Sequence, residues 1–162
     1  MTEKPLKTKH LILTPMTDEA LSRLAETAEE EREAYGQMLA LCREHPEDRL
    51  WYAPWQISLK SSPETPVGAL GFKGPQQKGR VELGYGVDLP YRCRGYATEA
   101  AGALIEWAFA QKDVYIVEAE AAPDNAASLR VLEKAGFIPM GVRGEEGPRF
   151  VWRGRKENRD GV

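Results

Sequence analysis

Short runs of alternating hydrophobic and polar residues dominate the first half of the chain. The first run stops at Pro15, and two helices are predicted after it, one capped by Thr17 and one over residues 29–44 that ends before Pro46. Turn-forming residues at 61–64 separate two later runs, which should form a hairpin. The strands predicted in this half cover residues 10–14, 51–59, 66–72 and 81–89.

Helical spacing is more prominent in the second half. Apolar residues at i, i+3, i+4 and i+7 predict a helix over 97–111, and a strand at 114–121 follows with apolar residues on both faces. Either Asp124 or Asn125 caps the next helix, and Gly136 fits the left-handed residue that closes it. Two hairpin strands, at 137–143 and 149–153, complete the pattern. These elements predict an α+β fold with helices on a mixed, mainly antiparallel sheet.

The composition fits one globular domain. A chain of 162 residues with 42% hydrophobic residues can bury a substantial core without disulfides. The net charge of -3 argues against a dedicated binder of nucleic acid or anionic membranes, and no apolar run approaches the ~20 residues of a membrane span. With two cysteines and no signal segment, the cytoplasm is the expected compartment. His10 and His45 lack metal-ligand spacing, so no metal is expected.

A candidate anion site lies between the strand at 81–89 and the helix at 97–111. The first amides of a helix lack partners and carry partial positive charge, a glycine such as Gly95 admits a phosphate close to the backbone, and arginines add charged donors, here Arg92 and Arg94. The alternative is that both arginines are solvated and Gly95 only turns the chain. The chain has no G-x-x-x-x-G-K-[ST] loop and no complete dinucleotide fingerprint, which argues against ATPases and dehydrogenases.

Two segments resemble a known family. Residues 92–97, Arg-Cys-Arg-Gly-Tyr-Ala, match the R/Q-x-x-G-x-G/A acetyl-CoA loop of the GNAT superfamily of N-acetyltransferases. Residues 125–137 resemble a second block of the branch that includes the ribosomal-protein N-terminal acetyltransferases, and residues 8–15 are similar to the first strand of that branch. The resemblance covers nearly the whole chain, so we expect a single N-acetyltransferase domain over residues 1–162 with a core at about 8–155.

This resemblance implies a sheet in which two neighbouring parallel strands splay apart and hold the pantetheine arm of acetyl-CoA. The backbone at Val87 and Leu89 would pair with the pantetheine amides, and Asn125 with Ser128 would line the thioester end. The expected pyrophosphate-binding residues are Arg92, Cys93, Arg94, Gly95, Tyr96, Ala97 and Thr98. The implied partners are acetyl-CoA and an amine acceptor, and the implied assembly is a monomer or a homodimer.

The chain also departs from the family pattern. Leu132 stands where many members carry a tyrosine that protonates the leaving thiolate, so Ser128, one helical turn earlier, is the candidate acid. Cys93 stands where many members have glycine, and we interpret it as a tolerated loop residue rather than a nucleophile.

An amine attacks a thioester only in its neutral form, so a base is useful at neutral pH. Glu82 is the candidate base because it alternates with Gly84 and Gly86 on the strand that leads to the loop, where small residues leave room for a substrate. A solvated charge is the alternative interpretation of Glu82. Glu118 and Glu120, on one face of the next strand, are the other candidates.

The predicted function is direct transfer of an acetyl group from acetyl-CoA to a primary amine on a protein N-terminus or a small molecule. A non-catalytic acyl-CoA-binding module is the alternative, and Leu132 is the residue that favours it. A structural domain without a ligand would require both motifs to be coincidental. The acidic run at 29–33 is either a solvated helix face or part of a site for a cationic amine.

Overall fold

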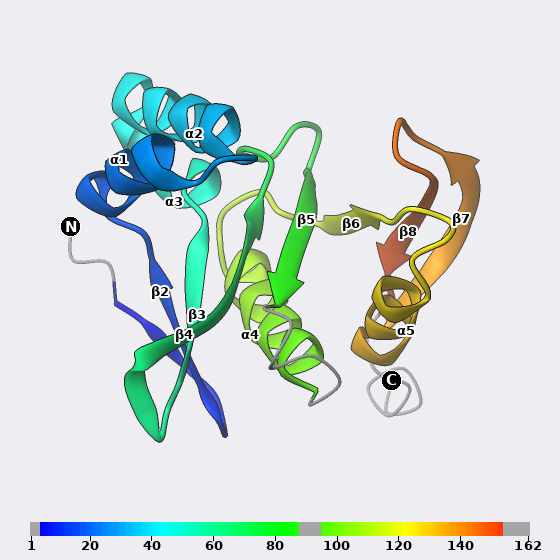
Figure 1. Cartoon of the computed structure of the whole chain (residues 1–162). Helices are drawn as coiled ribbons and strands as arrows, with labels where there is room; N and C mark the ends of the chain where they lie inside the picture. Colours follow the sequence, from blue (N-terminus) through cyan, green and yellow to red (C-terminus); the bar gives the residue numbers. More distant parts are fainter. Residues whose placement is uncertain (1–3, 88–94, 154–162) are drawn as a thin grey trace.

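The computed structural model describes residues 4–87 and 95–153 of the chain. Within them the strands form one eight-stranded sheet in the order β1-β2-β3-β4-β5-β6-β8-β7 (Figure 1). The β5–β6 pair is parallel, and every other neighbouring pair is antiparallel. The strands are β1 (Leu6–Lys7), β2 (Leu11–Pro15), β3 (Trp55–Leu59), β4 (Ser62–Phe72), β5 (Arg80–Val87), β6 (Ile116–Glu120), β7 (Phe137–Arg143) and β8 (Pro148–Trp152).

The helices fall into two groups. One group lies at the upper end of β2–β4 in Figure 1 and contains α1 (Asp18–Thr27), α2 (Arg32–Glu44) and α3 (Arg49–Tyr52), with a short 3-10 turn at Pro46–Asp48. The other contains α4 (Tyr96–Phe109), which packs on β2, β4 and β5, and α5 (Ala126–Ala135), which packs on α4 and β7. None of the helices in the described part of the chain is both long and apolar enough to cross a membrane.

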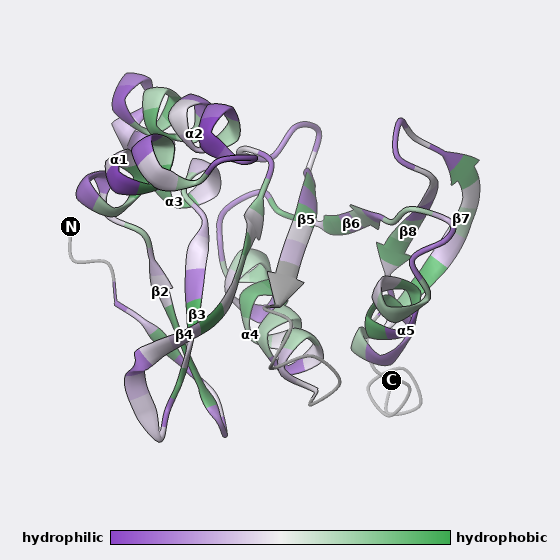
Figure 2. Ribbon diagram, in the orientation of Figure 1, coloured by the Kyte–Doolittle hydropathy of each residue, from purple (hydrophilic) through white to green (hydrophobic). Residues whose placement is uncertain are grey.

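Two apolar clusters follow from the alternation of side chains along the strands. Leu70 and Phe72 on β4 belong to the main core under α4, whereas Ala69, which directly precedes Leu70, packs against the cluster formed by α1, α2 and α3. Figure 2 shows hydrophobic colour on α4, while α1 and α2 are hydrophilic over much of their outer surface. The two helix groups therefore cover different faces of the sheet at β4.

Strand β5 presents opposite chemistry on its two faces. Val81, Leu83 and Tyr85 pack in the main core on the α4 side. Because side chains alternate, Glu82 and Gly84 lie on the other face. A Cβ atom built at Gly84 would meet no described heavy atom within 4 Å, so the space beside Gly84 is open.

The structure confirms the predicted fold class and most of the elements. Thr17 caps α1 by accepting a hydrogen bond from the Ala20 amide at 3.1 Å. Asn125, one of the two candidate caps, begins α5, and Gly136 closes that helix at φ 107°. The parallel pair expected from the family resemblance is β5–β6.

Several predicted boundaries were wrong because tertiary packing overrode the local pattern. Residues 49–52 form α3, so only the second part of the run at 51–59 is a strand; Trp51 packs on Phe72 and Trp107 instead of extending the sheet. The acidic residues 29–31 form the turn that reverses the chain between α1 and α2, and the helix starts at Arg32. At the predicted strand 114–121, β6 begins only at Ile116, and Tyr115 is 72% exposed rather than buried.

Candidate functional site

The candidate site is centred on the separation of β5 from β6. These strands pair in register from Arg80 with Ile116 to Leu83 with Ala119, and the pairing stops there. Strand β5 continues to Val87, still paired with β4, so its residues 84–87 extend beyond its pairing with β6. We call this feature the strand divergence. Within the described part of the chain, residues 84–87 have no strand partner on the side that β6 has left.

The N-terminus of α4 follows the strand divergence along the chain. Gly95 precedes the helix with φ 77°, a left-handed conformation that glycine adopts without a steric penalty, and no atom of the described residues lies within 4 Å of a Cβ built there. Tyr96, Ala97 and Thr98 form the first turn, whose amides have no partner within the helix. Leu89, Arg92, Cys93 and Arg94, the other residues predicted for the loop, lie outside the described residues.

Glu99 fastens this helical turn to the start of the sheet. Its carboxylate accepts hydrogen bonds from the Thr8 hydroxyl and, at 2.8 Å, from the His10 amide, and it lies 2.9 Å from His10 Nδ1. Partial desolvation raises the pKa of Glu99, but the hydrogen bonds from Thr8 and His10 outweigh it and hold that pKa below its ordinary value. An anchored first turn keeps the amides of α4 in a fixed direction.

The start of α5 brings Asn125 and Ser128 to the other side of the site. Asn125 Oδ1 accepts a hydrogen bond from the Ser128 amide at 3.0 Å, so Asn125 has a capping role. The Ser128 hydroxyl lies 2.8 Å from the hydroxyl of Tyr85, which comes from the strand divergence on β5. Burial raises the pKa of the Tyr85 phenol, although its hydrogen bond to Ser128 acts in the opposite direction.

Glu82 lies on the opposite face of β5, held between two cations. Its Oε1 atom accepts from Arg149 Nη2 at 3.1 Å, and its Oε2 atom lies 2.7 Å from Lys73 Nζ. The side chain of Lys73 is 55% exposed and that of Arg149 is 21% exposed, so Lys73 is the partner of Glu82 that solvent reaches more easily. Partial desolvation lowers the pKa of Lys73, but the Glu82 carboxylate outweighs it and raises that pKa.

The two other candidate bases belong to the same charged cluster. Arg149 donates to Glu118 at 3.0 Å and to Glu120 at 2.6 Å, and Arg80 donates to Glu118 at 2.5 Å. Desolvation lowers the pKa of Arg149, but its three carboxylate partners outweigh that effect and raise it well above the ordinary value. We call the set of Glu82, Glu118, Glu120 and Arg149 the Arg149 cluster.

Sequence reasoning did not find three of the residues at this site. Tyr85 was assigned only to an alternating strand, and Arg149 and Lys73 were assigned no role. The alternation along β5 does indicate that Tyr85 lies on the same face as Val81 and Leu83. It does not indicate the partner of the Tyr85 hydroxyl, because Ser128 is 43 residues away in sequence. Leu132 is 1% exposed and belongs to the main core, so its side chain is used for packing.

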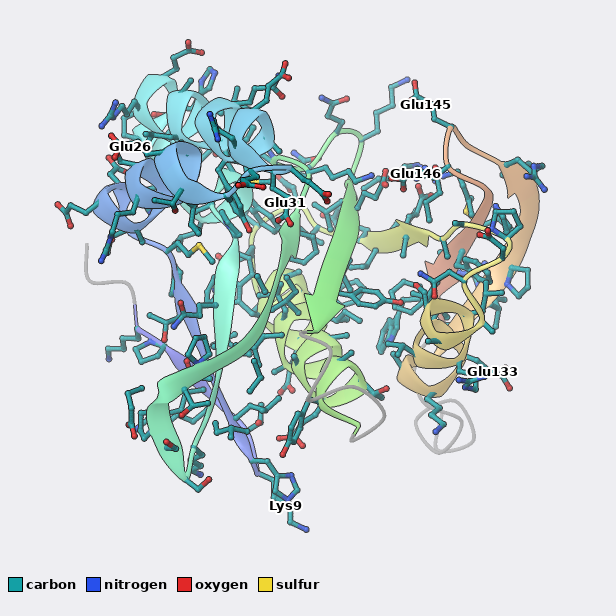
Figure 3. All side chains as sticks on the ribbon, viewed as in Figure 1. Lys9, Glu26, Glu31, Glu133, Glu145 and Glu146 are labelled. Atoms are coloured by element: carbon teal, nitrogen blue, oxygen red, sulfur yellow. The ribbon has the colours of Figure 1, made fainter. Side chains whose placement is uncertain are left out.

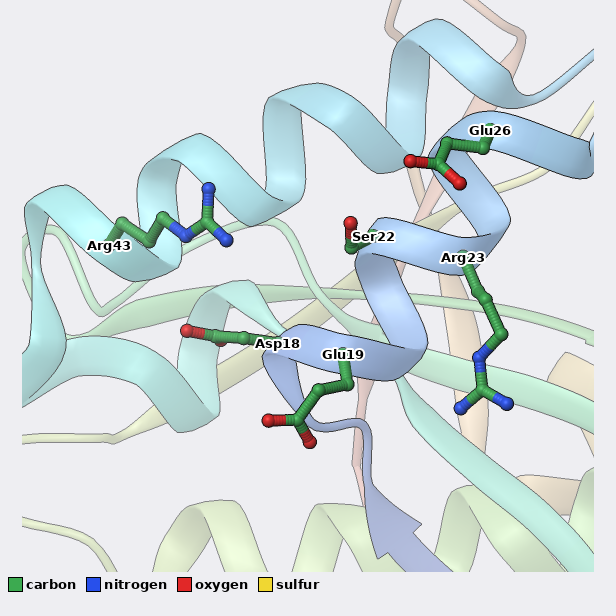
Figure 4. A pocket seen from close by; sticks show the side chains of 6 residues that line it. All are labelled: Asp18, Glu19, Ser22, Arg23, Glu26 and Arg43. Carbon is green, nitrogen blue, oxygen red and sulfur yellow. The ribbon is translucent and has the colours of Figure 1, made fainter.

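A surface groove lies away from this site, between α1 and α2. Figure 4 shows the six side chains that line it, which are Asp18, Glu19, Ser22, Arg23, Glu26 and Arg43. None of them belongs to the predicted site, and Asp18 is already paired with Arg49 at 2.7 Å. Over residues 4–87 and 95–153, no group of three or more His, Cys, Asp or Glu side chains is arranged to hold a metal ion.

The chain matches known proteins over most of its length. Residues 10–138 match the family profile described as the acetyltransferase (GNAT) domain. An uncharacterized N-acetyltransferase of Bacillus subtilis, YjdG, is 40% identical over 85 residues, which are 52% of this chain and 50% of that protein. The uncharacterized N-acetyltransferase p20 of Bacillus licheniformis is 27% identical over 139 residues, covering 85% of this chain and 70% of that one. The chain thus spans half the length of YjdG.

Solved structures share the same architecture. An acetyltransferase from Agrobacterium tumefaciens superposes with a TM-score of 0.72 at 21% identity, covering 94% of this chain and 96% of that one. A ribosomal-protein-S5-alanine acetyltransferase from Vibrio fischeri gives a TM-score of 0.71 at 16% identity, with 92% and 94% covered. At these identities the similarity concerns the fold.

Proposed function

Because the chain belongs to the acetyltransferase (GNAT) domain family, we propose that it transfers an acetyl group from acetyl-CoA directly to a primary amine. The observation that carries this proposal is the strand divergence, followed along the chain by the N-terminus of α4. The strand divergence offers unpaired backbone groups to the extended pantetheine arm of acetyl-CoA. The N-terminus of α4 offers amides and partial positive charge to its phosphates.

The residues fit this cosubstrate. Backbone groups at Val87 and Leu89 would pair with the pantetheine amides, and Asn125 with Ser128 would line the thioester end. The open space at Gly95 supports close approach of a pyrophosphate, since no described atom lies within 4 Å of a Cβ built there. The residues proposed to hold the pyrophosphate are Arg92, Cys93, Arg94, Gly95, Tyr96, Ala97 and Thr98.

Bound acetyl-CoA would supply a thioester, whose carbonyl carbon is open to attack by a neutral amine. We assign Glu82 as the group that takes the proton from the amine, and Ser128 as the group that gives a proton to the sulfur. Glu82 and Tyr85 lie on opposite faces of β5, and Tyr85 contacts Ser128. Proton removal and proton donation are therefore assigned to different sides of one strand, which suits an amine that enters opposite the leaving group.

Positioning would contribute most of the rate, since no nucleophilic side chain is assigned a covalent role. Residues 84–87 and the first turn of α4 would orient the donor, and the backbone N–H near Val87 would stabilise negative charge on the carbonyl oxygen. Open space over Gly84, on the same face as Glu82, supports the approach of an acceptor from that side.

Acidic side chains support a cationic acceptor. Residues 29–31 form the turn between α1 and α2, and Glu145 and Glu146 form part of the turn between β7 and β8. Figure 3 shows Glu31, Glu145 and Glu146 toward the same end of the molecule, the end at which β5 begins. A polyamine, an amino acid or a basic protein N-terminus would meet this requirement.

The remaining parts of the proposal concern the whole protein. One sheet that contains all eight strands from β1 to β8 supports a single domain over residues 1–162 with its core at about 8–155. The cytoplasm, where free thiols stay reduced, is the proposed compartment, and the proposed assembly is a monomer or a homodimer.

The test is isothermal titration with acetyl-CoA and desulfo-CoA, followed by thiol release against a panel of polyamines, amino acids and peptide N-termini. Micromolar binding with amine-dependent release of thiol supports the enzyme and identifies its acceptor class. Binding without release across the panel would favour the non-catalytic acyl-CoA-binding module. Absence of binding would overturn the assignment of the strand divergence.

A further inference from the structure

Helix α5 lacks a phenol of its own at Leu132, yet a phenol reaches that helix from the neighbouring strand. The Tyr85 hydroxyl lies 2.8 Å from Ser128 Oγ and 3.0 Å from the carbonyl oxygen of Ser128. Tyr85 belongs to residues 84–87, so the contact spans from the strand divergence on β5 to the first turn of α5. The two residues are 43 positions apart in the chain.

We propose that Tyr85 is a positioning residue for proton donation: its hydroxyl fixes the Ser128 hydroxyl at the strand divergence, so that Ser128 can protonate the leaving sulfur. This inference rests on the proposed function and adds a residue to it. The Tyr85–Ser128 pair thereby replaces the single phenol that other members of the family are expected to carry at the position of Leu132.

Two contacts immobilise Ser128. Its amide donates to Asn125 Oδ1 at 3.0 Å, which fixes the backbone at the start of α5, and its hydroxyl is held by Tyr85. A serine hydroxyl in the first turn of a helix otherwise rotates freely among its rotamers. Fixing that rotamer in advance removes an entropic cost from the step in which the proton is donated.

The phenol suits this role because it stays a hydrogen-bond donor. Burial raises the pKa of Tyr85 above the ordinary value of about 10, so the hydroxyl keeps its proton at working pH. The single proton of the phenol has two acceptors within reach, Ser128 Oγ at 2.8 Å and the Ser128 carbonyl oxygen at 3.0 Å. The proposed role uses the first, because a phenol that donates to Oγ leaves the proton of Oγ to point elsewhere. The same contact stabilises negative charge on Oγ while that proton leaves.

The proton balance closes without a further reactant. The amine nitrogen forms a bond to the acetyl carbon, the carbon–sulfur bond breaks, and the sulfur receives both its electron pair and the proton of Ser128 Oγ. The nitrogen loses one proton to Glu82, and solvent then carries that proton from Glu82 back to Ser128, so both groups return to their starting forms. Tyr85 keeps its own proton throughout.

A purely structural role is the competing explanation. The Tyr85 ring packs against the main core, and its bond to the Ser128 carbonyl oxygen by itself links β5 to α5. A residue with only this structural role would affect folding and the affinity for the cosubstrate. A positioning residue affects turnover while that affinity stays the same. The two roles therefore differ in which measured constants change.

The experiment compares Y85F, S128A and the double variant in single-turnover thiol release and in titrations with CoA and desulfo-CoA. We expect about tenfold lower turnover for Y85F and about a hundredfold for S128A, with the double variant no slower than S128A. Affinity for desulfo-CoA should stay within about twofold in all three, because desulfo-CoA lacks the sulfur. The preference for CoA over desulfo-CoA should fall in Y85F and S128A alike.

Two further variants complete the design. S128T keeps a hydroxyl on the same carbon and should recover most of the turnover that S128A loses. Y115F removes a phenol that is 72% exposed and should leave turnover and both affinities within about twofold of the wild type.

Three results would overturn the inference. One is an unchanged turnover in Y85F, and another is independent, multiplicative losses in the double variant. The third is a Y85F variant that loses desulfo-CoA affinity and thermal stability together with turnover, which would show that Tyr85 has only a structural role. A wild-type protein that binds no CoA, by contrast, would refute the proposed function itself.

Discussion

Arg149 on β8 donates a hydrogen bond of 3.1 Å to Glu82 on β5, although β6 lies between these strands in the sheet. The same guanidinium bonds to Glu118 and Glu120 on the intervening strand. One arginine therefore connects three strands beside the point where β5 and β6 separate. It also fixes where the candidate base is held.

Replacing Glu82 by glutamine should lower turnover by about tenfold to a hundredfold, with desulfo-CoA affinity unchanged. The loss should be larger at lower pH, because there the acceptor amine is protonated and must lose its proton before it attacks. Profiles of kcat against pH for the wild type and Glu82→Gln, with one amine acceptor, measure this.

Glu118→Gln is the matched control for Glu82→Gln. It also removes one carboxylate charge from the Arg149 cluster, and Glu118 is 10% exposed in its side chain against 21% for Glu82. Turnover should fall much less in Glu118→Gln. Equal losses in the two variants would mean that the cluster as a whole matters and that Glu82 is not the base.

Replacing Arg149 by methionine should destabilise the fold, since it leaves three carboxylates close together without their shared counter-ion. We expect Tm to fall by about 5 °C at neutral pH. Arg143→Met, at an exposed position on β7, is the control and should change Tm by about 1 °C or less. Differential scanning fluorimetry measures both, and an unchanged Tm in Arg149→Met would show that the cluster does not stabilise the sheet.

The bonds of Glu99 to Thr8 and His10 predict an acid-sensitive contribution to stability. The pKa of Glu99 is lower in the folded protein than its ordinary value, so its contribution is complete above about pH 5 and is lost as pH falls through the folded pKa. Glu99→Gln should therefore lower Tm by about 3 °C at pH 7, and the difference from the wild type should shrink toward pH 3. Scanning calorimetry across this range is the measurement.

Glu106→Gln provides the comparison on the same helix. Glu106 is exposed on α4, and its removal should leave Tm almost unchanged at every pH. A wild-type advantage over Glu99→Gln that persisted undiminished at pH 3 would contradict the ionic origin of the contact.

Gly95→Asp should abolish acetyl-CoA binding, because it adds a Cβ at φ 77° and a negative charge where the pyrophosphate is proposed to lie. Gly102→Ala in the interior of the same helix is the control. Apart from the backbone of its own helix, a Cβ at Gly102 meets no described atom within 4 Å, so that variant should bind normally and gain about 0.5–1 kcal/mol of stability. Isothermal titration with acetyl-CoA compares the two variants. Normal binding by Gly95→Asp would show that the loop at Gly95 does not hold the pyrophosphate.

The locally encoded elements were predicted correctly from the sequence. Thr17 and Asn125 cap helices because a side-chain oxygen needs only an amide two or three residues away, and Gly136 closes a helix because its own backbone tolerates the left-handed conformation. The alternation along β5 likewise assigned Glu82 and its apolar neighbours to opposite faces. In the candidate site, the family resemblance named Gly95, the first turn of α4, Asn125 and Ser128, and their binding roles stay predictions.

Which side chains meet was decided only by the tertiary structure. The sequence does not indicate that Arg149 reaches Glu82 from 67 residues away, or that Tyr85 meets Ser128, because each contact depends on the strand order and on the end of β5–β6 pairing. Residues 49–52 form a helix in which Trp51 packs against Phe72 and Trp107, a contact with distant segments that the local pattern does not reveal. Short-range rules of capping and periodicity thus determined the elements, whereas long-range packing decided the partners of the charged and hydroxyl groups at the site.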